Sequence, residues 1–144
     1  MSVYKTILVA LDLSNEAKTV LAKAADLAQR YGGADLTLIH VIEPMVLDNS
    51  YESLPVISVD VEKALYERAQ QFLKEIAEEQ GLATSRRRVE IGSVKNEILH
   101  VAKQSNADLL VIGTHGRHGI AMLLGSTANA VLHGTTCDVL AVKV

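Results

Sequence analysis

Short apolar runs alternate with amphipathic stretches of helical period along this chain. The runs are rich in β-branched residues and leucine and almost continuously apolar, which is typical of parallel strands covered on both faces. The stretches between them are long enough for crossover helices, which are right-handed and cover both faces of the sheet. The alternation therefore predicts an α/β fold with a doubly wound parallel sheet of five strands, at residues 3–11, 36–42, 86–91, 108–112 and 139–144.

Four helices are expected between these strands. Ser14 is placed to cap the first helix, and the glycine pair at 32–33 to end it. The second carries apolar positions from Val61 to Ile76, and the other two are expected at residues 94–104 and 126–133. Residues 43–58 contain both prolines and read as a long loop. Because no repeat or interdomain linker is evident, residues 1–144 are expected to form a single domain.

Composition narrows the class of protein. A chain of 144 residues with 49% hydrophobic residues can bury a substantial core. Its net charge of −3 provides no basic field to attract nucleic acid, and one cysteine excludes an internal disulfide. No apolar run approaches the roughly 20 residues that span a bilayer, and the N-terminal stretch lacks a signal-peptide pattern. These features predict a soluble cytoplasmic protein.

Four of the nine glycines lie in one stretch, GTHGRHGIAMLLGS, from Gly113 to Ser126. With the first strand central, this stretch follows a neighbouring strand and meets the loop 10–14 where ligands bind open α/β sheets. It ends at the start of a helix, where free amides and the helix dipole favour an anion. It contains neither a Walker lysine nor the G-x-G-x-x-G fingerprint. A phosphate cradle and a mobile glycine-rich connection both remain open on this pattern.

Three segments resemble the universal stress proteins: TILVALDLS (6–14), LTLIHVIEP (36–44) and the C-terminal stretch from ADLLVIGTHGR onward (107–144). The resemblance covers nearly the whole chain. It implies the strand order 3-2-1-4-5 and a homodimer. One branch of that family binds ATP through G-x2-G-x9-G-[ST], whereas another branch lacks the motif and binds no nucleotide.

Carried onto this chain, the resemblance makes Gly113, Gly116, Gly125 and Ser126 the phosphate-binding positions. Asp12 is then expected to contact the ribose or a phosphate-bound Mg²⁺, and to bind metal only through the nucleotide. Ala10 and Val41 are expected to line the adenine site. Eight residues separate Gly116 from Gly125 where the ATP-binding motif has nine. The nucleotide-binding residues expected in full are Ala10, Asp12, Val41, Gly113, Gly116, Arg117, Gly125, Ser126 and Thr127.

Other polar residues have simpler interpretations. His115 and His118 have a metal-ligand spacing without further ligands nearby, so solvated loop residues are favoured. Asp12 has the alternative of a turn residue that accepts nearby backbone amides. The arginines at 86–88 are expected on a solvated edge strand. Cys137 is expected to be a small buried hydrophobe, and His40 and His100 structural.

The sequence thus predicts a cytoplasmic stress-response protein that binds ATP, with or without Mg²⁺, and acts as a regulatory or signalling dimer. The dimer is expected through the C-terminal strand, Val139 to Val144, because an apolar edge strand invites pairing. Catalysis is not favoured, since no positioned base is evident. Two alternatives stay open: a nucleotide-free dimeric interaction protein of the same family, and a slow ATPase. The regulatory protein partner is not indicated.

Overall fold

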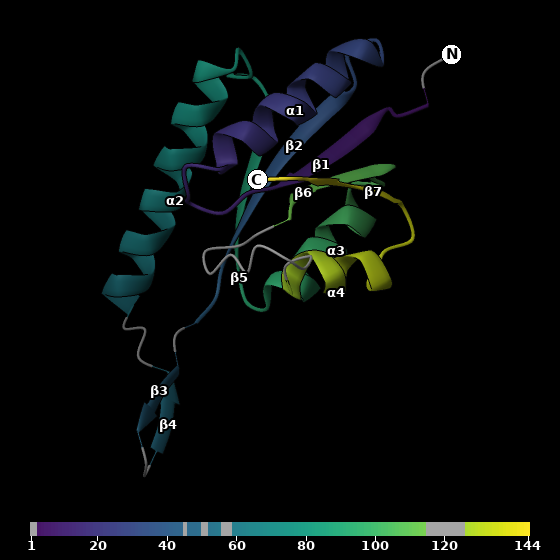
Figure 1. Cartoon of the computed structure of the whole chain (residues 1–144). Helices are drawn as coiled ribbons and strands as arrows, with labels where there is room; N and C mark the ends of the chain where they lie inside the picture. The colour runs from purple at the N-terminus through teal and green to yellow at the C-terminus, as the bar shows by residue number, and fades with distance from the viewer. Residues whose placement is uncertain (1–2, 45, 50–51, 56–58, 115–125) are drawn as a thin grey trace.

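The computed structural model describes residues 3–44, 46–49, 52–55, 59–114 and 126–144 (Figure 1). Within these ranges, five parallel strands form one sheet in the order β5-β2-β1-β6-β7. Counted along the parallel strands alone, this order is 3-2-1-4-5, so the predicted fold class is confirmed. The strands are β1 Thr6–Ala10, β2 Asp35–Ile42, β5 Arg86–Ile91, β6 Leu109–Gly113 and β7 Asp138–Val142.

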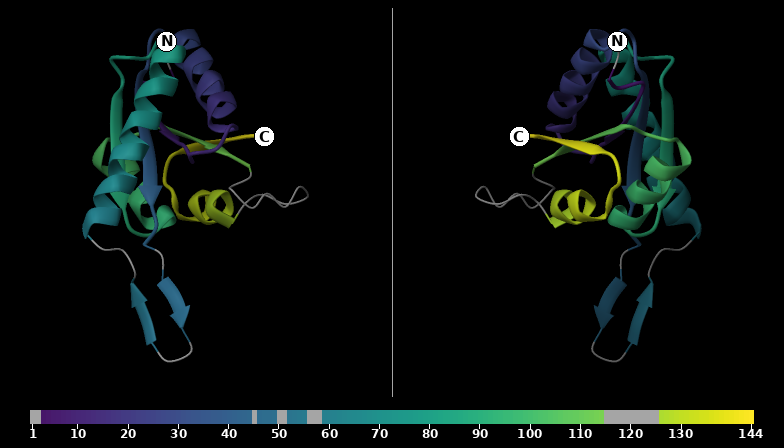
Figure 2. Two further views of the ribbon diagram at one scale, coloured as in Figure 1. Left: turned by 90° about the vertical axis from the view of Figure 1, so that its left-hand side faces the viewer. Right: turned by 90° about the vertical axis from the view of Figure 1, so that its right-hand side faces the viewer.

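Helices cover both faces of the sheet (Figure 2). α1 (Ala17–Arg30) and α2 (Val59–Glu79) pack on one face, and α3 (Val94–Gln104) and α4 (Ser126–Gly134) pack on the other. The expected helices are confirmed, apart from shifts of a few residues at their ends. None of the helices in the described ranges is long and apolar enough to cross a bilayer.

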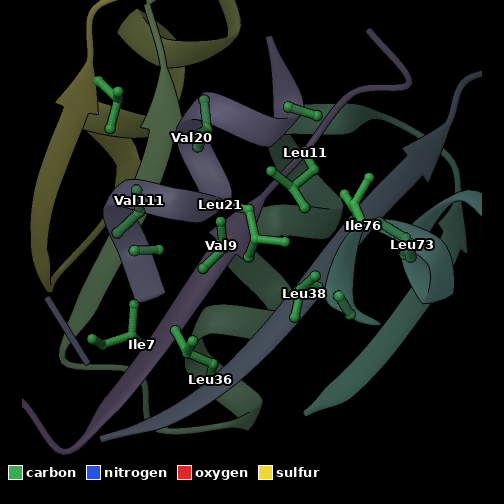
Figure 3. Packing of buried hydrophobic residues seen from close by; sticks show 14 of the residues in the cluster. Ile7, Val9, Leu11, Val20, Leu21, Leu36, Leu38, Leu73, Ile76 and Val111 are labelled. Carbon is green, nitrogen blue, oxygen red and sulfur yellow. The ribbon is translucent and has the colours of Figure 1, made fainter. Parts of the chain in front are cut away.

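The core explains why the strand runs are continuously apolar. Side chains alternate along β1, so Ile7 and Val9 face α1 and α2, whereas Leu8 faces α3 and α4. All three are 0% exposed. Figure 3 shows Ile7 and Val9 among the side chains of the first cluster, with Leu21 of α1 and Leu73 of α2. A central strand buried on both faces cannot alternate with polar residues, which is why β1 reads as one apolar run.

A β-hairpin replaces part of the long loop expected at residues 43–58. β3 (Val46–Asn49) and β4 (Glu52–Pro55) pair antiparallel, from Val46 opposite Pro55 to Asn49 opposite Glu52. The hairpin projects beyond the end of β2, away from the sheet (Figure 2). The loop prediction was wrong there because strands of four residues, separate from the five-stranded sheet, leave no long apolar run in the sequence. Pro55 is tolerated because an isolated hairpin has two edges with no further ladder to satisfy.

Ser14 does not cap α1, contrary to the expectation. The helix begins at Ala17, and the preceding Glu16 makes no side-chain capping hydrogen bond. The Ser14 hydroxyl donates instead to the Asp12 carboxylate, while the Ser14 carbonyl accepts from the Ala17 amide at 3.2 Å. Because α1 begins at Ala17, its N-cap position is residue 16, and Ser14 lies two residues too early to cap it.

Two carboxylates fasten the amino-terminal edge of the sheet. Asp108, just before β6, accepts the backbone amides of Lys5 at 2.9 Å and Thr6 at 3.0 Å. The Tyr4 hydroxyl donates to Asp138 at the start of β7, at 2.7 Å. That hydrogen bond, with burial and the charge of Asp138, raises the pKa of Tyr4 to about 12. These contacts hold residues 4–6, which lead into β1, against the residues that begin β6 and β7.

Candidate functional site

The chain changes direction across the sheet between β1 and β6. From β1 it passes to α1 on one face, and from β6 it leads towards α4 on the other. β1 and β6 pair in parallel, from Ile7 opposite Leu109 to Val9 opposite Val111. Their carboxyl ends therefore form the switch point at which open α/β sheets bind ligands. We refer to this position as the crevice; residues 10–14 and 113–114 follow the two strands, and residues 126–127 begin the helix to which β6 leads.

The loop after β1 is held by the neighbouring strand. The Leu11 amide donates to the Ile39 carbonyl at 2.9 Å, and the Leu11 carbonyl accepts from Nδ1 of His40 at 2.8 Å. A carbonyl can only accept, so His40 carries its proton on Nδ1 in this contact. His40 is 8% exposed, and the structural role expected for it is consistent with this contact. Pattern alone could not reveal its partner, which lies 29 residues away in the sequence.

Asp12 forms the turn that sequence reasoning left as an alternative. Its Oδ1 accepts the Ser14 amide at 3.1 Å as well as the Ser14 hydroxyl. Its Oδ2 accepts no hydrogen bond from any residue that the structure describes. The turn thus occupies one carboxylate oxygen, and the half-buried side chain keeps the second for another partner.

Ala10 and Val41 lie on the same face at the ends of neighbouring strands. Ala10 is opposite Ile39, and Val41 is two residues further along β2, so both face α3 and α4. Ala10 is half-buried, whereas Val41 is 8% exposed and offers a ligand little surface. Of the two residues, Ala10 therefore has the larger fraction of surface that a ligand could contact.

On the other side of the crevice, residues 113–114 are held by β7. Gly113 pairs with Val142 of β7, and the next residue, Thr114, donates its amide to the Val142 carbonyl at 2.9 Å. Ser126 and Thr127 are exposed in the first turn of α4, which carries no acidic side chain. The positive end of the α4 dipole is therefore not neutralised by its own first turn.

The remaining candidates fall outside the described ranges or away from the crevice. Gly116, Arg117 and Gly125, with His115 and His118, lie in 115–125, outside the described residues. Within those residues, no group of three or more His, Cys, Asp or Glu side chains could hold a metal ion. Cys137 is half-buried rather than buried, with its Sγ 3.1 Å from Oγ1 of Thr135. His100 is exposed on α3.

Residues 3–143 match the family model described as the universal stress protein family. The chain belongs to this family. Universal stress protein A homolog 2 of Coxiella burnetii is 44% identical to it over 100% of this chain and 98% of the relative.

Solved structures of the family agree in fold. A universal stress protein UspA from Lactobacillus plantarum is 27% identical, with a TM-score of 0.76 over 96% of this chain and 97% of that one. A universal stress protein solved in complex with cAMP is 26% identical, with a TM-score of 0.72 over 98% of each chain. The resemblance of the sequence to the universal stress proteins is thus confirmed.

Proposed function

We propose that this universal stress protein binds ATP in the crevice and reports its occupancy as a regulatory, cytoplasmic homodimer, with residues 1–144 acting as one unit. The observation that carries the proposal is the second oxygen of Asp12. It lies at the switch point, on a turn already satisfied through Oδ1, and has no hydrogen-bond partner in the described chain. The cAMP complex of a related fold supports an adenine nucleotide as ligand class.

Each part of the nucleotide has a chemical counterpart in this proposal. Ala10 would pack against adenine, with a small contribution from the exposed part of Val41. Asp12 Oδ2 would accept a hydrogen bond from a ribose hydroxyl or bind a phosphate-bound Mg²⁺. The first turn of α4, at Ser126 and Thr127, would supply amides to a phosphate. Gly113, Gly116, Arg117 and Gly125 complete the proposed site from the glycine-rich stretch. Mg²⁺ would neutralise part of the phosphate charge, and it prefers oxygen ligands such as the Asp12 carboxylate.

Calorimetry with the full chain tests the proposal. ATP with Mg²⁺ is expected to bind at least about tenfold more tightly than adenosine, because adenosine lacks the phosphates that the α4 amides would contact. cAMP, which has one phosphate, serves as a third ligand. Equal affinity for ATP and adenosine would contradict the phosphate site. No binding at millimolar nucleotide would favour the nucleotide-free alternative. Release of inorganic phosphate from bound ATP would favour the slow ATPase.

The dimer is proposed through β7, which pairs only with β6 among the described strands. The strand ends at Val142, and beyond it the Val144 amide donates to Oγ1 of Thr114 at 3.3 Å. The predicted segment Val139 to Val144 therefore combines most of an edge strand with one residue, Val144, that is hydrogen-bonded to Thr114. Val142 is buried in the chain's own core at 6% exposure, whereas Ala141 is exposed. Ala141 is the better probe of pairing.

Ala141→Glu is expected to raise the dimer dissociation constant by roughly tenfold or more, because a symmetric interface brings two like charges together. Sedimentation at micromolar concentration measures it. Ala64→Glu, on the exposed side of α2, adds the same charge away from β7 and is expected to leave the dimer unchanged. A wild-type chain that sediments as a monomer would exclude this interface.

A further inference from the structure

A groove runs along the outer edge of the sheet, between α2 and β5. It consists of a hollow of about 450 Å³ beside Arg87 and Val89 and a second of about 360 Å³ beside Ile91. These β5 residues alternate along the strand and share one face. The α2 residues that line the two hollows lie on one side of the helix, and they include one acidic and one basic residue beside Ile91: Val59, Glu62, Lys63, Tyr66, Glu67, Gln70, Gln71 and Lys74. The two hollows thus follow one another along α2 and β5, and together they are here called the edge groove.

The two ends of the edge groove differ in chemistry. At one end, Lys74 and Arg87 make no ion pair with any residue the structure describes, and Arg87 donates one hydrogen bond to the Ala83 carbonyl at 3.1 Å. Glu67 offsets only part of their charge. At the other end, Val59 is 84% exposed beside Tyr66 and Ile91. The groove is cationic at one end and largely apolar at the other.

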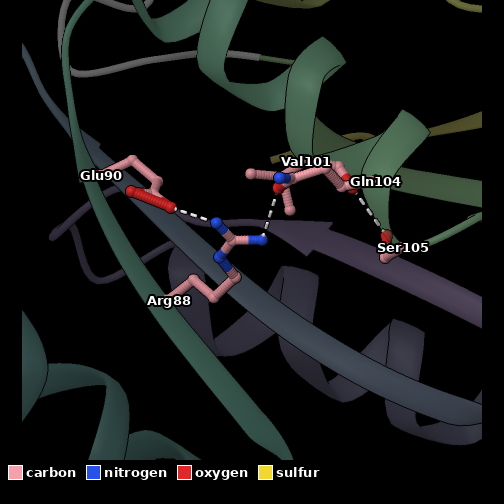
Figure 4. Close-up of polar contacts among 5 residues, drawn as sticks. All are labelled: Arg88, Glu90, Val101, Gln104 and Ser105. Atoms are coloured by element: carbon pink, nitrogen blue, oxygen red, sulfur yellow. Dashed lines mark hydrogen bonds and ion pairs between the residues drawn. The ribbon is translucent and has the colours of Figure 1, made fainter.

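The adjacent arginine shows that this charge is not a general property of the strand. Arg88 points to the opposite face, where it pairs with Glu90 and donates to Oε1 of Gln104 at 3.1 Å (Figure 4). Its charge is thus compensated within the chain. Exposed charge on an edge strand discourages aggregation, but this does not account for a groove that brings Arg87 and Lys74 together from two elements.

β5 also offers unpaired backbone groups beside the groove. It is the edge of the sheet opposite β7 and pairs only with β2 among the described strands. Figure 2 shows α2 alongside this edge at the outside of the molecule. An edge strand next to side-chain pockets is the arrangement by which an extended peptide joins a sheet, with backbone hydrogen bonds for affinity and alternate side chains for specificity.

We propose that the edge groove binds an extended segment of a partner protein, which adds to β5 as a further strand. Arg87 and Ile91 are four residues apart, about 13 Å along a strand at roughly 3.3 Å per residue. The segment therefore carries an acidic side chain for the Arg87–Lys74 end and an apolar side chain four residues away for the Ile91 end. Charge complementarity selects a partner of this composition. The site is separate from the crevice and does not depend on nucleotide.

Fluorescence anisotropy with the full chain tests the proposal. The probes are two labelled, threonine-rich peptides with one glutamate and one leucine four residues apart, in the two possible orders. One of them is expected to bind, and to slow amide hydrogen exchange of residues 86–91. A matched peptide with the two residues three apart places them on opposite faces of a strand. It is expected to bind roughly tenfold more weakly.

Charge reversal in the protein provides the second arm. Lys74→Glu and Arg87→Glu are each expected to weaken binding roughly tenfold, and a peptide with lysine in place of glutamate is expected to prefer the Lys74→Glu variant. Arg86→Glu, on the opposite face of β5, makes the same change outside the groove and serves as the control. Equal loss with Arg86→Glu, indifference to peptide spacing, or absence of binding by both peptides would overturn the proposal. Exchange protection of β5 that rises with protein concentration alone would assign the groove to a second copy instead.

Discussion

Asp12→Asn is expected to weaken binding of ATP with Mg²⁺ by about tenfold to a hundredfold while thermal stability stays nearly unchanged. Asparagine keeps an Oδ1 that accepts the Ser14 amide and hydroxyl, so the turn survives. It replaces Oδ2, the oxygen without a described partner, by an amide that carries no charge and cannot bind a metal ion. Loss of one charged contact costs about 1.5–3 kcal/mol, which corresponds to this range of affinity.

Calorimetry and thermal unfolding on the same preparation check both halves of this expectation. Asp12→Ala is the companion variant, because it removes the turn acceptor as well and is expected to lower stability and affinity together. If Asp12→Asn binds nucleotide as tightly as the wild type and unfolds at a lower temperature, Asp12 serves the turn alone. Nucleotide binding at the first turn of α4 would then be tested only by the comparison of ATP with adenosine.

Asp108→Ala is expected to reduce the free energy of unfolding by about 3 kcal/mol. Its carboxylate accepts the amides of Lys5 and Thr6, and the bond to Thr6 is partly buried. Alanine leaves both amides without this acceptor at the entry to the central strand. Urea denaturation measures the change.

Asp26→Ala is the matched control for this prediction. Asp26 pairs with Arg30 one turn along α1, with both side chains largely exposed. Such surface pairs contribute little, so the free energy of unfolding is expected to change by less than about 0.5 kcal/mol. A similar small change for Asp108→Ala would show that water replaces its bonds to β1 at little cost.

Much of the fold was predictable because burial on both faces leaves a direct signature in the sequence. β1 and β6 are continuously apolar for that reason, and α3 was predicted at its observed bounds. The hairpin at β3 and β4 left no such signature, because its short strands form a separate sheet that projects away from the five-stranded one. Ser14 misled for a related reason: a capping residue and a turn residue look alike until the position of the Asp12 carboxylate is known.

The candidate site was predictable in position but not in detail. Strand order alone brings Ala10, Asp12 and Gly113 to one edge of the sheet. Which oxygen of Asp12 accepts from Ser14, and which one has no described partner, depends on hydrogen-bond geometry. The contact from His40 to Leu11 depends on strand register. The edge groove was also not foreseen, because it arises only when one face of α2 packs beside one face of β5.

The central position of β1 has a consequence for how the chain folds during synthesis. β1 and β2 are separated only by α1, but the partner on the other side of β1 is synthesised much later, since Thr6 and Asp108 are 102 residues apart. At synthesis rates of about 5–20 residues per second, β1 keeps the backbone N–H and C=O groups of one edge unpaired for several seconds before β6 is made. During that interval the open edge of β1 can pair with a wrong strand, and it is protected only once β6 pairs with it.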